Sequence, residues 1–117
     1  MIELTLPWPP TNLSPNQRQH YQARARAKKA YRAACSWSAI QQGIEKIDAQ
    51  KLRVSLTFVP PSKRGYDLDN LLARMKSGLD GLADVLGVDD KHWRLIIEKA
   101  DDKHIGGMVK VRVEVLG

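Results

Sequence analysis

The stretch LRVSLTFVPPSKRGYDLDNLLARMKSGLDGLADVLG, residues 52–87, decides the fold, because a strand signal and a helix signal follow one another within it. Apolar and polar side chains alternate from Leu52 to Phe58, which is typical of a half-buried strand, and Pro60-Pro61 ends that strand. Beyond residue 70 the apolar side chains recur every three or four positions. This spacing predicts a helix with one apolar side, which stops near Gly87.

The remaining segments predict three more strands and one long helix. Residues 2–6, 93–100 and 109–115 have strand patterns, and residues 7–16 form a proline-rich loop in which we expect Trp8 to pack rather than to stack on a base. Residues 16–47 predict a helix whose core-facing stripe is Ala27, Ala30, Ala34, Trp37, Ile40 and Ile44. The order β-α-β-α-β-β over residues 1–117 predicts one α+β domain, with two helices covering one face of a small mixed or antiparallel four-stranded sheet.

Composition and charge narrow the class of protein. No apolar run approaches the roughly 20 residues that span a bilayer, and the first residues lack the pattern of a signal peptide. The single cysteine, Cys35, fits a reducing compartment, so we expect a cytoplasmic protein without a membrane partner. The net charge of +6 favours polyanionic partners such as nucleic acid.

Basic side chains concentrate in two places. No acid occurs between Glu3 and Glu45, so we expect the basic residues of the predicted long helix to have no acid to pair with. A second basic run is the turn before residue 67. Contact with a phosphate backbone is one interpretation and a solvated helix face is the other. The candidate DNA-binding residues are Arg18, Arg24, Lys28, Arg32, Lys63 and Arg64.

Acidic side chains concentrate elsewhere, because nine of the thirteen Asp and Glu residues lie between Asp67 and Asp102. Carboxylates are the ligands that Mg²⁺ and Mn²⁺ prefer, and one or two of them together with a substrate phosphate make a metal site. Asp67 and Asp69 are the first candidates for such ligands. The alternative is that one of them simply caps the following helix.

Lys76 and Asp80 fall within about 20° of the line through Asp69 along a helix, since each residue turns the chain by roughly 100°. If the loop carrying Asp89-Asp90 folds back, three carboxylates could converge, and phosphodiester hydrolysis uses metal ions held in this way. Lys76 could steady the charge that develops on the phosphate. The alternatives are an ordinary Lys76–Asp80 ion pair and plain turn chemistry at Asp89-Asp90.

Four motifs in this order resemble the RusA family of Holliday-junction resolvases over nearly the whole chain. They are Leu6-Pro7-Trp8-Pro9-Pro10-x-Asn12, Asp67-Leu68-Asp69-Asn70-Leu71, Lys76-x-x-x-Asp80-x-Leu82 and Asp89-Asp90. The resemblance implies one RusA-like domain over residues 1–117, acting as a homodimeric, Mg²⁺-dependent endodeoxyribonuclease that cuts four-way DNA junctions. Family catalytic aspartates fall on Asp67, Asp69 and Asp90. The family lysine falls on Ala73 when aligned from Asp69 and on Lys76 when aligned from Asp80, and we take Lys76.

Two further hypotheses come from the residues alone. In the first, the protein is a non-catalytic DNA-binding or regulatory module, whose acids are helix caps and turn residues. In the second, it is a metal-dependent hydrolase of nucleotides or RNA. A junction has near-twofold symmetry and needs two nicks, whereas the chain has one acidic cluster, so the nuclease hypothesis requires a twofold dimer.

Overall fold

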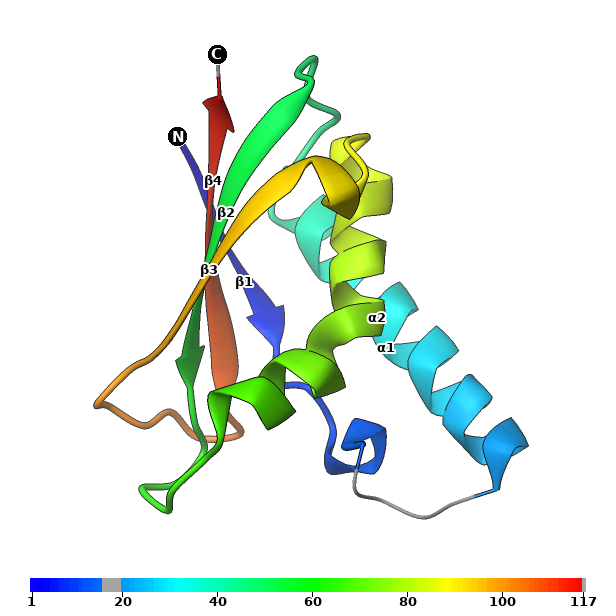
Figure 1. Cartoon of the computed structure of the whole chain (residues 1–117), viewed down its shortest axis with the longest axis vertical. Helices are drawn as coiled ribbons and strands as arrows, with labels where there is room; N and C mark the ends of the chain where they lie inside the picture. Colours follow the sequence, from blue (N-terminus) through cyan, green and yellow to red (C-terminus); the bar gives the residue numbers. More distant parts are fainter. Residues whose placement is uncertain (16–19, 117) are drawn as a thin grey trace.

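The computed structural model describes residues 1–15 and 20–116. Its element order confirms the predicted α+β fold, with four strands, two helices and two short 3₁₀ turns (Figure 1). The elements are β1 (Ile2–Pro7), η1 (Thr11–Leu13), α1 (Tyr21–Gln41), β2 (Lys51–Val59), α2 (Leu68–Leu86), η2 (Asp90–His92), β3 (Trp93–Lys99) and β4 (Met108–Leu116). Neither described helix is both long enough and apolar enough to cross a membrane.

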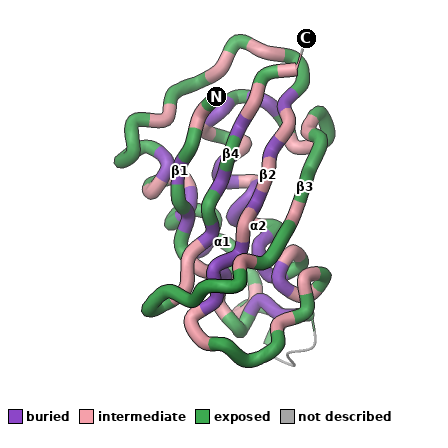
Figure 2. Tube along the Cα trace, turned by 90° about the vertical axis from the view of Figure 1, so that its left-hand side faces the viewer, coloured by how far each residue is buried: buried purple, intermediate pink, exposed green. Residues whose placement is uncertain are grey.

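The sheet is mixed, with strand order β1-β4-β2-β3. β4 runs antiparallel to both β1 and β2, whereas β3 runs parallel to β2 because α2 makes the crossover between them. Both helices cover one face of the sheet (Figure 1), and the strands alternate between buried and exposed residues in the view of the other face (Figure 2). β1 and β3 are therefore the two edge strands.

The core forms between the sheet and α2 as the sequence predicts. Leu52, Val54, Leu56 and Phe58 of β2 are fully buried. They meet the apolar side of α2, whose buried members are Leu71, Met75, Leu79, Leu82 and Leu86. Gly87, which takes the left-handed conformation at φ 75°, ends α2 where the sequence predicts.

The long helix differs from its prediction in length and in its buried face. α1 begins at Tyr21, where the Gln22 amide donates to the His20 ring, and it ends at Gln41 instead of residue 47. The predicted stripe is wrong: Ala30, Ala34, Trp37 and Ile40 are exposed, Ala27 and Ile44 are half-buried, and the buried residues of α1 are Tyr31, Cys35 and Ala39. Two series of apolar residues run along α1, the predicted one and the one that contains Tyr31, Cys35 and Ala39. The shape of the α2 surface determines which of the two is buried.

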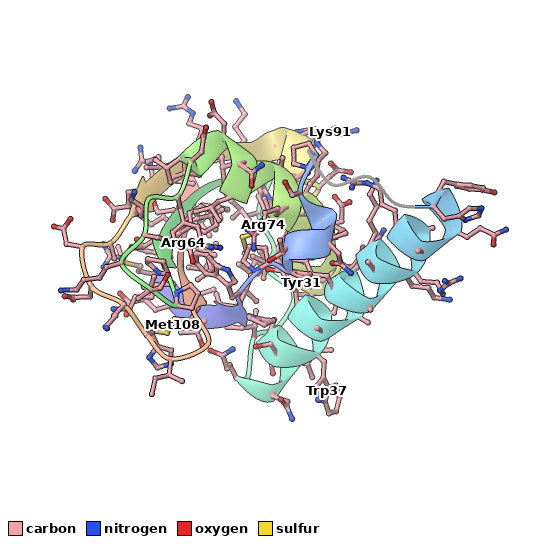
Figure 3. All side chains as sticks on the ribbon, turned by 90° about the horizontal axis from the view of Figure 1, so that it is seen from below. Tyr31, Trp37, Arg64, Arg74, Lys91 and Met108 are labelled. Atoms are coloured by element: carbon pink, nitrogen blue, oxygen red, sulfur yellow. The ribbon has the colours of Figure 1, made fainter. Side chains whose placement is uncertain are left out.

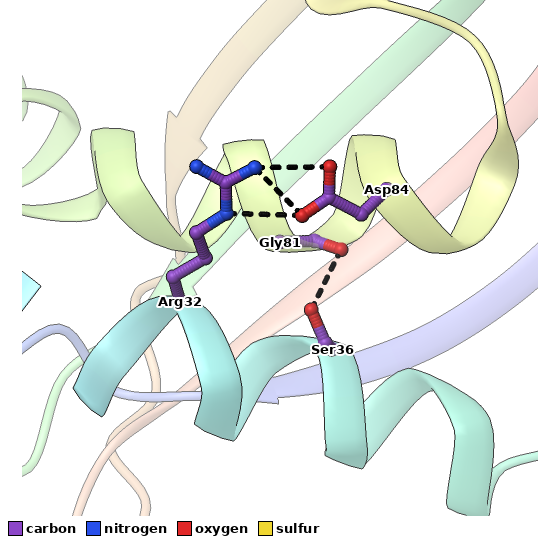
Figure 4. A network of polar contacts seen from close by, with 4 residues as sticks. All are labelled: Arg32, Ser36, Gly81 and Asp84. Atoms are coloured by element: carbon purple, nitrogen blue, oxygen red, sulfur yellow. Dashed lines mark hydrogen bonds and ion pairs between the residues drawn. The ribbon is translucent and has the colours of Figure 1, made fainter. Parts of the chain in front are cut away.

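Two glycines of α2 select the buried series by allowing a close approach between the helices. Gly78 lies under Tyr31 and Cys35, and Gly81 lies against the Arg32 carbonyl oxygen, so that a Cβ at either position would overlap these atoms. The Ser36 hydroxyl donates to the Gly81 carbonyl at 2.9 Å (Figure 4). Burial in this contact raises the pKa of the Cys35 thiol to about 11.

Replacing Gly81 by Ala should therefore destabilise the protein. The added methyl group meets backbone rather than a flexible side chain, and overpacking of this kind costs about 1–3 kcal/mol. Chemical denaturation followed by circular dichroism measures the loss. Gly65→Ala is the matched control, because a Cβ at Gly65 has no atom within 4 Å, and equal stability of the two variants would contradict this packing.

Candidate functional site

Asp67 starts α2, and its carboxylate accepts a hydrogen bond from the Asp69 amide at 2.9 Å. Asp67 therefore caps α2, which was the alternative to metal binding, and it has the extended conformation that an N-cap needs. Both Asp67 and Asp69 are exposed, and Asp69 lies in the first helical turn. The positive end of the helix dipole favours two carboxylates at this position.

The two carboxylates border a groove of about 600 Å³ at the amino end of α2. Its walls come from three segments that are far apart in the sequence, namely the proline-rich loop, the β2–α2 turn and the first turns of α2. The groove is lined by Ser14, Pro15, Arg64, Gly65, Tyr66, Asp67, Asp69, Asn70 and Arg74. Asn70 ties two of these walls together, since its amide nitrogen donates to the Ser14 hydroxyl at 3.0 Å.

Arg74 of α2 lines the groove and holds the proline-rich loop in place. Its side chain is 6% exposed and donates to the carbonyl of Pro9 at 2.6 Å and to that of Pro10 at 3.3 Å. Its guanidinium also lies over the Trp8 ring at 5.9 Å, and burial lowers its pKa. The three ion pairs between described residues do not include Arg74. Arg74 also lines the groove, and its positive charge has no carboxylate partner in the described part of the chain.

The loop is held from both helices. Tyr31 of α1 donates its hydroxyl to the Pro7 carbonyl at 2.7 Å, and Arg24 donates to the carbonyls of Leu13 and Ser14 at 3.2 and 3.1 Å. Together with the bonds of Arg74, these bonds tie backbone carbonyls of residues 7–14 to both helices. Arg74 is not among the site residues predicted from the sequence, although a charged residue between Leu71 and Met75 on an apolar helix side was a usable signal.

Trp8 packs in the protein, as predicted. Its ring meets the edge of Phe58 at a centroid distance of 6.2 Å and that of Tyr66 at 5.5 Å. Arg64 in turn lies over Tyr66 at 5.1 Å, so the two rings of Trp8 and Tyr66, which pack edge to face, have a cation at each end, Arg74 and Arg64. Figure 3 shows Arg64 and Arg74 on the same side of the molecule.

A second group of charged side chains surrounds Asp90, which lies in η2 just after α2. Burial raises the pKa of Asp90, as do its hydrogen bond with Asp89 and the charges of Asp80 and Asp89, while the charge of Lys76 lowers it. Asp90 is therefore near Asp80 and Lys76. Asp89 has a local role, because it caps η2 by accepting a hydrogen bond from the Lys91 amide at 3.0 Å.

The structure does not bring the three predicted aspartates into one metal site. Within residues 1–15 and 20–116, no three His, Cys, Asp or Glu side chains are grouped so that they could hold a metal ion. Asp67 and Asp69 lie at the start of α2, whereas Asp90 approaches Asp80, eleven residues or roughly 16 Å beyond Asp69 along the helix. The assignment of Asp67, Asp69 and Asp90 as metal ligands thus stays a prediction.

The predicted DNA-binding residues have different roles in the structure. Arg24 is used in holding the loop, and Arg32 forms a bidentate pair with Asp84 of α2 at 2.9 and 3.0 Å (Figure 4). The expectation that this face has no acid to pair with is wrong for Arg32, since its partner comes from the other helix. Lys28 lines a groove of about 220 Å³ that Lys76 and Asp80 also line. Lys63 and Arg64 are exposed in the β2–α2 turn, and Arg18 lies outside the described residues.

Replacing Asp90 by Asn should stabilise the protein at neutral pH. A carboxyl whose pKa is raised by the fold destabilises the fold when it is charged, and this penalty disappears below its ordinary pKa of 3.8. Because the group is partly exposed, we expect a gain of a few tenths of a kcal/mol at pH 7 that vanishes on acidification.

Thermal unfolding in EDTA across pH 3–8 measures the gain, with Asp101→Asn in an exposed loop as the control. A melting temperature of Asp90→Asn at pH 7 equal to or below that of the wild type would contradict the raised pKa of Asp90.

Comparison with known proteins gives a relative without an assigned activity. No protein-family model matches the chain. An uncharacterized protein of Xylella fastidiosa (strain Temecula1 / ATCC 700964) is 39% identical over 100 residues, which cover 80% of this chain and 63% of the relative. The chain thus spans less than two thirds of the length of the curated relative that it matches.

Proposed function

We propose that the protein is a Mg²⁺-dependent, structure-selective endodeoxyribonuclease that resolves four-way DNA junctions. The observation that carries the proposal is an exposed pair of carboxylates, Asp67 and Asp69, in a groove that Arg64 and Arg74 also line. The two arginines attract a phosphate backbone, and the two carboxylates give a divalent metal a place beside that phosphate. The motif resemblance to RusA resolvases supplies the substrate class.

The residues of the groove fit Mg²⁺ bound in part by substrate. Mg²⁺ commonly takes one or two carboxylates from the protein and completes its shell with water and substrate phosphate, so a closed protein cage is not required. Asp67 and Asp69 would hold the ion, whereas Asp90, the third aspartate implied by the resemblance, lies near Asp80 further along α2 and is not grouped with them. When bound, the metal supplies neutralisation of phosphate charge and activation of water near neutral pH, and Mn²⁺ can replace it.

The chain's own residues position the DNA in this proposal. Arg64 and Lys63 project from the β2–α2 turn at the rim of the groove and contact the phosphate backbone. Arg74 keeps the proline-rich loop in place as the opposite wall. Lys76 offsets the charge of Asp90 and stabilises the developing charge on the leaving oxygen.

Two copies related by a twofold axis would supply the two nicks that a junction needs, so the proposal includes a homodimer acting on DNA in the cytoplasm.

A second candidate function is a non-catalytic DNA-binding module. The observation in its favour is that Asp67 and Asp89 both cap helical turns, which gives two of the acids a structural purpose. The two candidates differ in one respect, which is the ability to break a phosphodiester bond.

A single gel separates the candidates. Purified protein is incubated with a four-way junction, a linear duplex, single-stranded DNA and single-stranded RNA, each with Mg²⁺, with Mn²⁺ and with EDTA. The nuclease proposal predicts metal-dependent nicking of the junction in preference to the other substrates. Binding without nicking in every metal condition would support the binding module, and equal turnover of all substrates would support a general nucleic-acid hydrolase.

Replacing Lys76 by Ala should lower the rate of junction cleavage by about 10²-fold, with binding changed less than threefold, because a charge aimed at the transition state contributes to the chemical step. Single-turnover cleavage and a binding assay in EDTA measure the two effects. Lys103→Ala, in the exposed β3–β4 loop, is the control. Equal losses of binding and rate would assign Lys76 to phosphate positioning.

A further inference from the structure

The two edge strands of the sheet, β1 and β3, differ in whether side chains hydrogen-bond to their outer backbone groups. The edge of β1 is covered, because the Thr5 amide donates to the Gln42 side chain at 2.8 Å, while Gln42 and Ser38 donate to the Thr5 carbonyl at 2.6 and 3.1 Å. No comparable side-chain bond reaches the backbone of β3 from any described residue, and no helix or strand lies along its outer side in Figure 2. The backbone groups of this edge are available for pairing.

The β3 edge is also apolar, which an unprotected edge strand usually is not. Leu95 is 39% exposed and Ile96 is 48% exposed, next to half-buried Ile97. Natural proteins protect such edges with charges, prolines or bulges, since a free apolar strand recruits another chain. The sequence Trp93-Arg94-Leu95-Ile96-Ile97-Glu98-Lys99 has one charge near its start, two at its end and none in the middle.

We propose that β3 pairs antiparallel with β3 of a second copy of this chain, about a twofold axis through Ile96. In this register Arg94 lies opposite Glu98 of the partner subunit, and Glu98 lies opposite Arg94 of the partner subunit. Opposite charges that face each other across an antiparallel pair stabilise it, and the twofold axis makes the contact twice. Ile96 meets its own copy.

We infer that the partner strand belongs to a second copy of this chain, because Arg94 and Glu98 lie at equal distances on either side of Ile96 and so face each other in an antiparallel pair. Shifting the register by one or two residues in either direction places Arg94 opposite Ile96, Ile97, Lys99 or Ala100 of the partner subunit, none of which is an acid. A parallel arrangement in register would place arginine opposite arginine.

This register also brings the hydrophobic cores of the two copies into contact at β3. Trp93 and Ile97 pack against the core on the helix side, so Leu95 projects to that side as well. Pairing places Leu95 opposite Ile97 of the partner subunit and gives one continuous eight-stranded sheet, with the helices of both copies on the same face. The dimer surface goes beyond the proposed cleavage and does not depend on it, and its test uses neither DNA nor metal.

A charge swap tests the pairing. The dimer dissociation constant is measured by sedimentation for the wild type, for Arg94→Glu, for Glu98→Arg and for the double variant. We expect each single change to raise the constant about tenfold or more, since like charges then face each other twice, and the double variant to return within about threefold of the wild type. Trp37→Ala, on the exposed face of α1, should leave the constant unchanged.

Cysteine cross-linking tests the register. Ile96→Cys should form a disulfide-linked dimer under mild oxidation, because the two copies of this residue lie directly opposite each other. Arg94→Cys should not link to itself, being roughly 13 Å from its copy along the strands, but should link to Glu98→Cys in a mixture. A monomeric wild type at 100 µM, or a dimer sensitive to Trp37→Ala and insensitive to both charge changes, would overturn the proposal.

Discussion

Replacing Asp69 by Asn is expected to reduce Mg²⁺-dependent nicking of a four-way junction by about 10²-fold or more, while junction binding in EDTA is kept or improved. Asn is nearly isosteric with Asp, and the helix keeps its start because the capping side chain is that of Asp67. The change therefore removes one negative charge from the groove with little effect on the fold. Losing that charge weakens metal binding and reduces the repulsion of DNA phosphates.

Asp101→Asn is the matched control for this variant, because it removes a carboxylate from an exposed loop outside the groove. Single-turnover cleavage and a gel-shift titration should show a large loss of rate for Asp69→Asn and none for Asp101→Asn. Unchanged cleavage by Asp69→Asn would remove the acid pair from the mechanism. Loss of binding in EDTA would instead give Asp69 a structural role.

Replacing Arg74 by Met is expected to lower the free energy of unfolding by about 2–3 kcal/mol. Met fills much of the same volume but leaves the carbonyls of Pro9 and Pro10 without their charged donor, and hydrogen bonds to charged groups contribute roughly 1.5–3 kcal/mol each. Relief of the burial of a cation offsets part of the loss, which is why we expect less than the full sum.

The Arg74 variant also tests the connection between stability and the groove. Without Arg74, the loop that forms the wall at Ser14 and Pro15 loses one of its supports, and junction affinity should fall together with stability. Arg26→Met, on the exposed side of α1, is the control and should change stability by less than about 0.5 kcal/mol. Equal stability of the two variants in urea denaturation would show that the loop does not depend on Arg74.

The sequence predicts a helix or strand correctly where its apolar residues follow a single periodic pattern. β2 alternates cleanly and α2 has a single apolar side ending at Gly87, so both were predictable, and together they determine the layering of the fold. α1 has two apolar series, and periodicity cannot rank them. The buried one contains Tyr31 and Cys35, because these residues fit the surface of Gly78, which is a property of two helices rather than of one.

The site was predictable in part for the same reason. Asp67 and Asp69 are close in sequence, so their shared position needs only a helix start. The approach of Asp90 to Asp80 depends on the path of the chain after α2, and the pairing of Arg32 with Asp84 depends on how the helices cross. Arg74 was recognisable as a charged residue on the apolar side of α2, but its partners, the carbonyls of two prolines, carry no sequence signal.

Cleavage of a supercoiled plasmid that extrudes a cruciform tests the proposed activity most directly. Two symmetric nicks across the four-way junction convert the plasmid to a linear molecule, whereas a single nick gives an open circle. We predict linear product with Mg²⁺, none with EDTA and none with Asp69→Asn. A plasmid that stays supercoiled at every Mg²⁺ and Mn²⁺ concentration, although the wild-type protein binds the junction, would contradict the proposed nuclease activity.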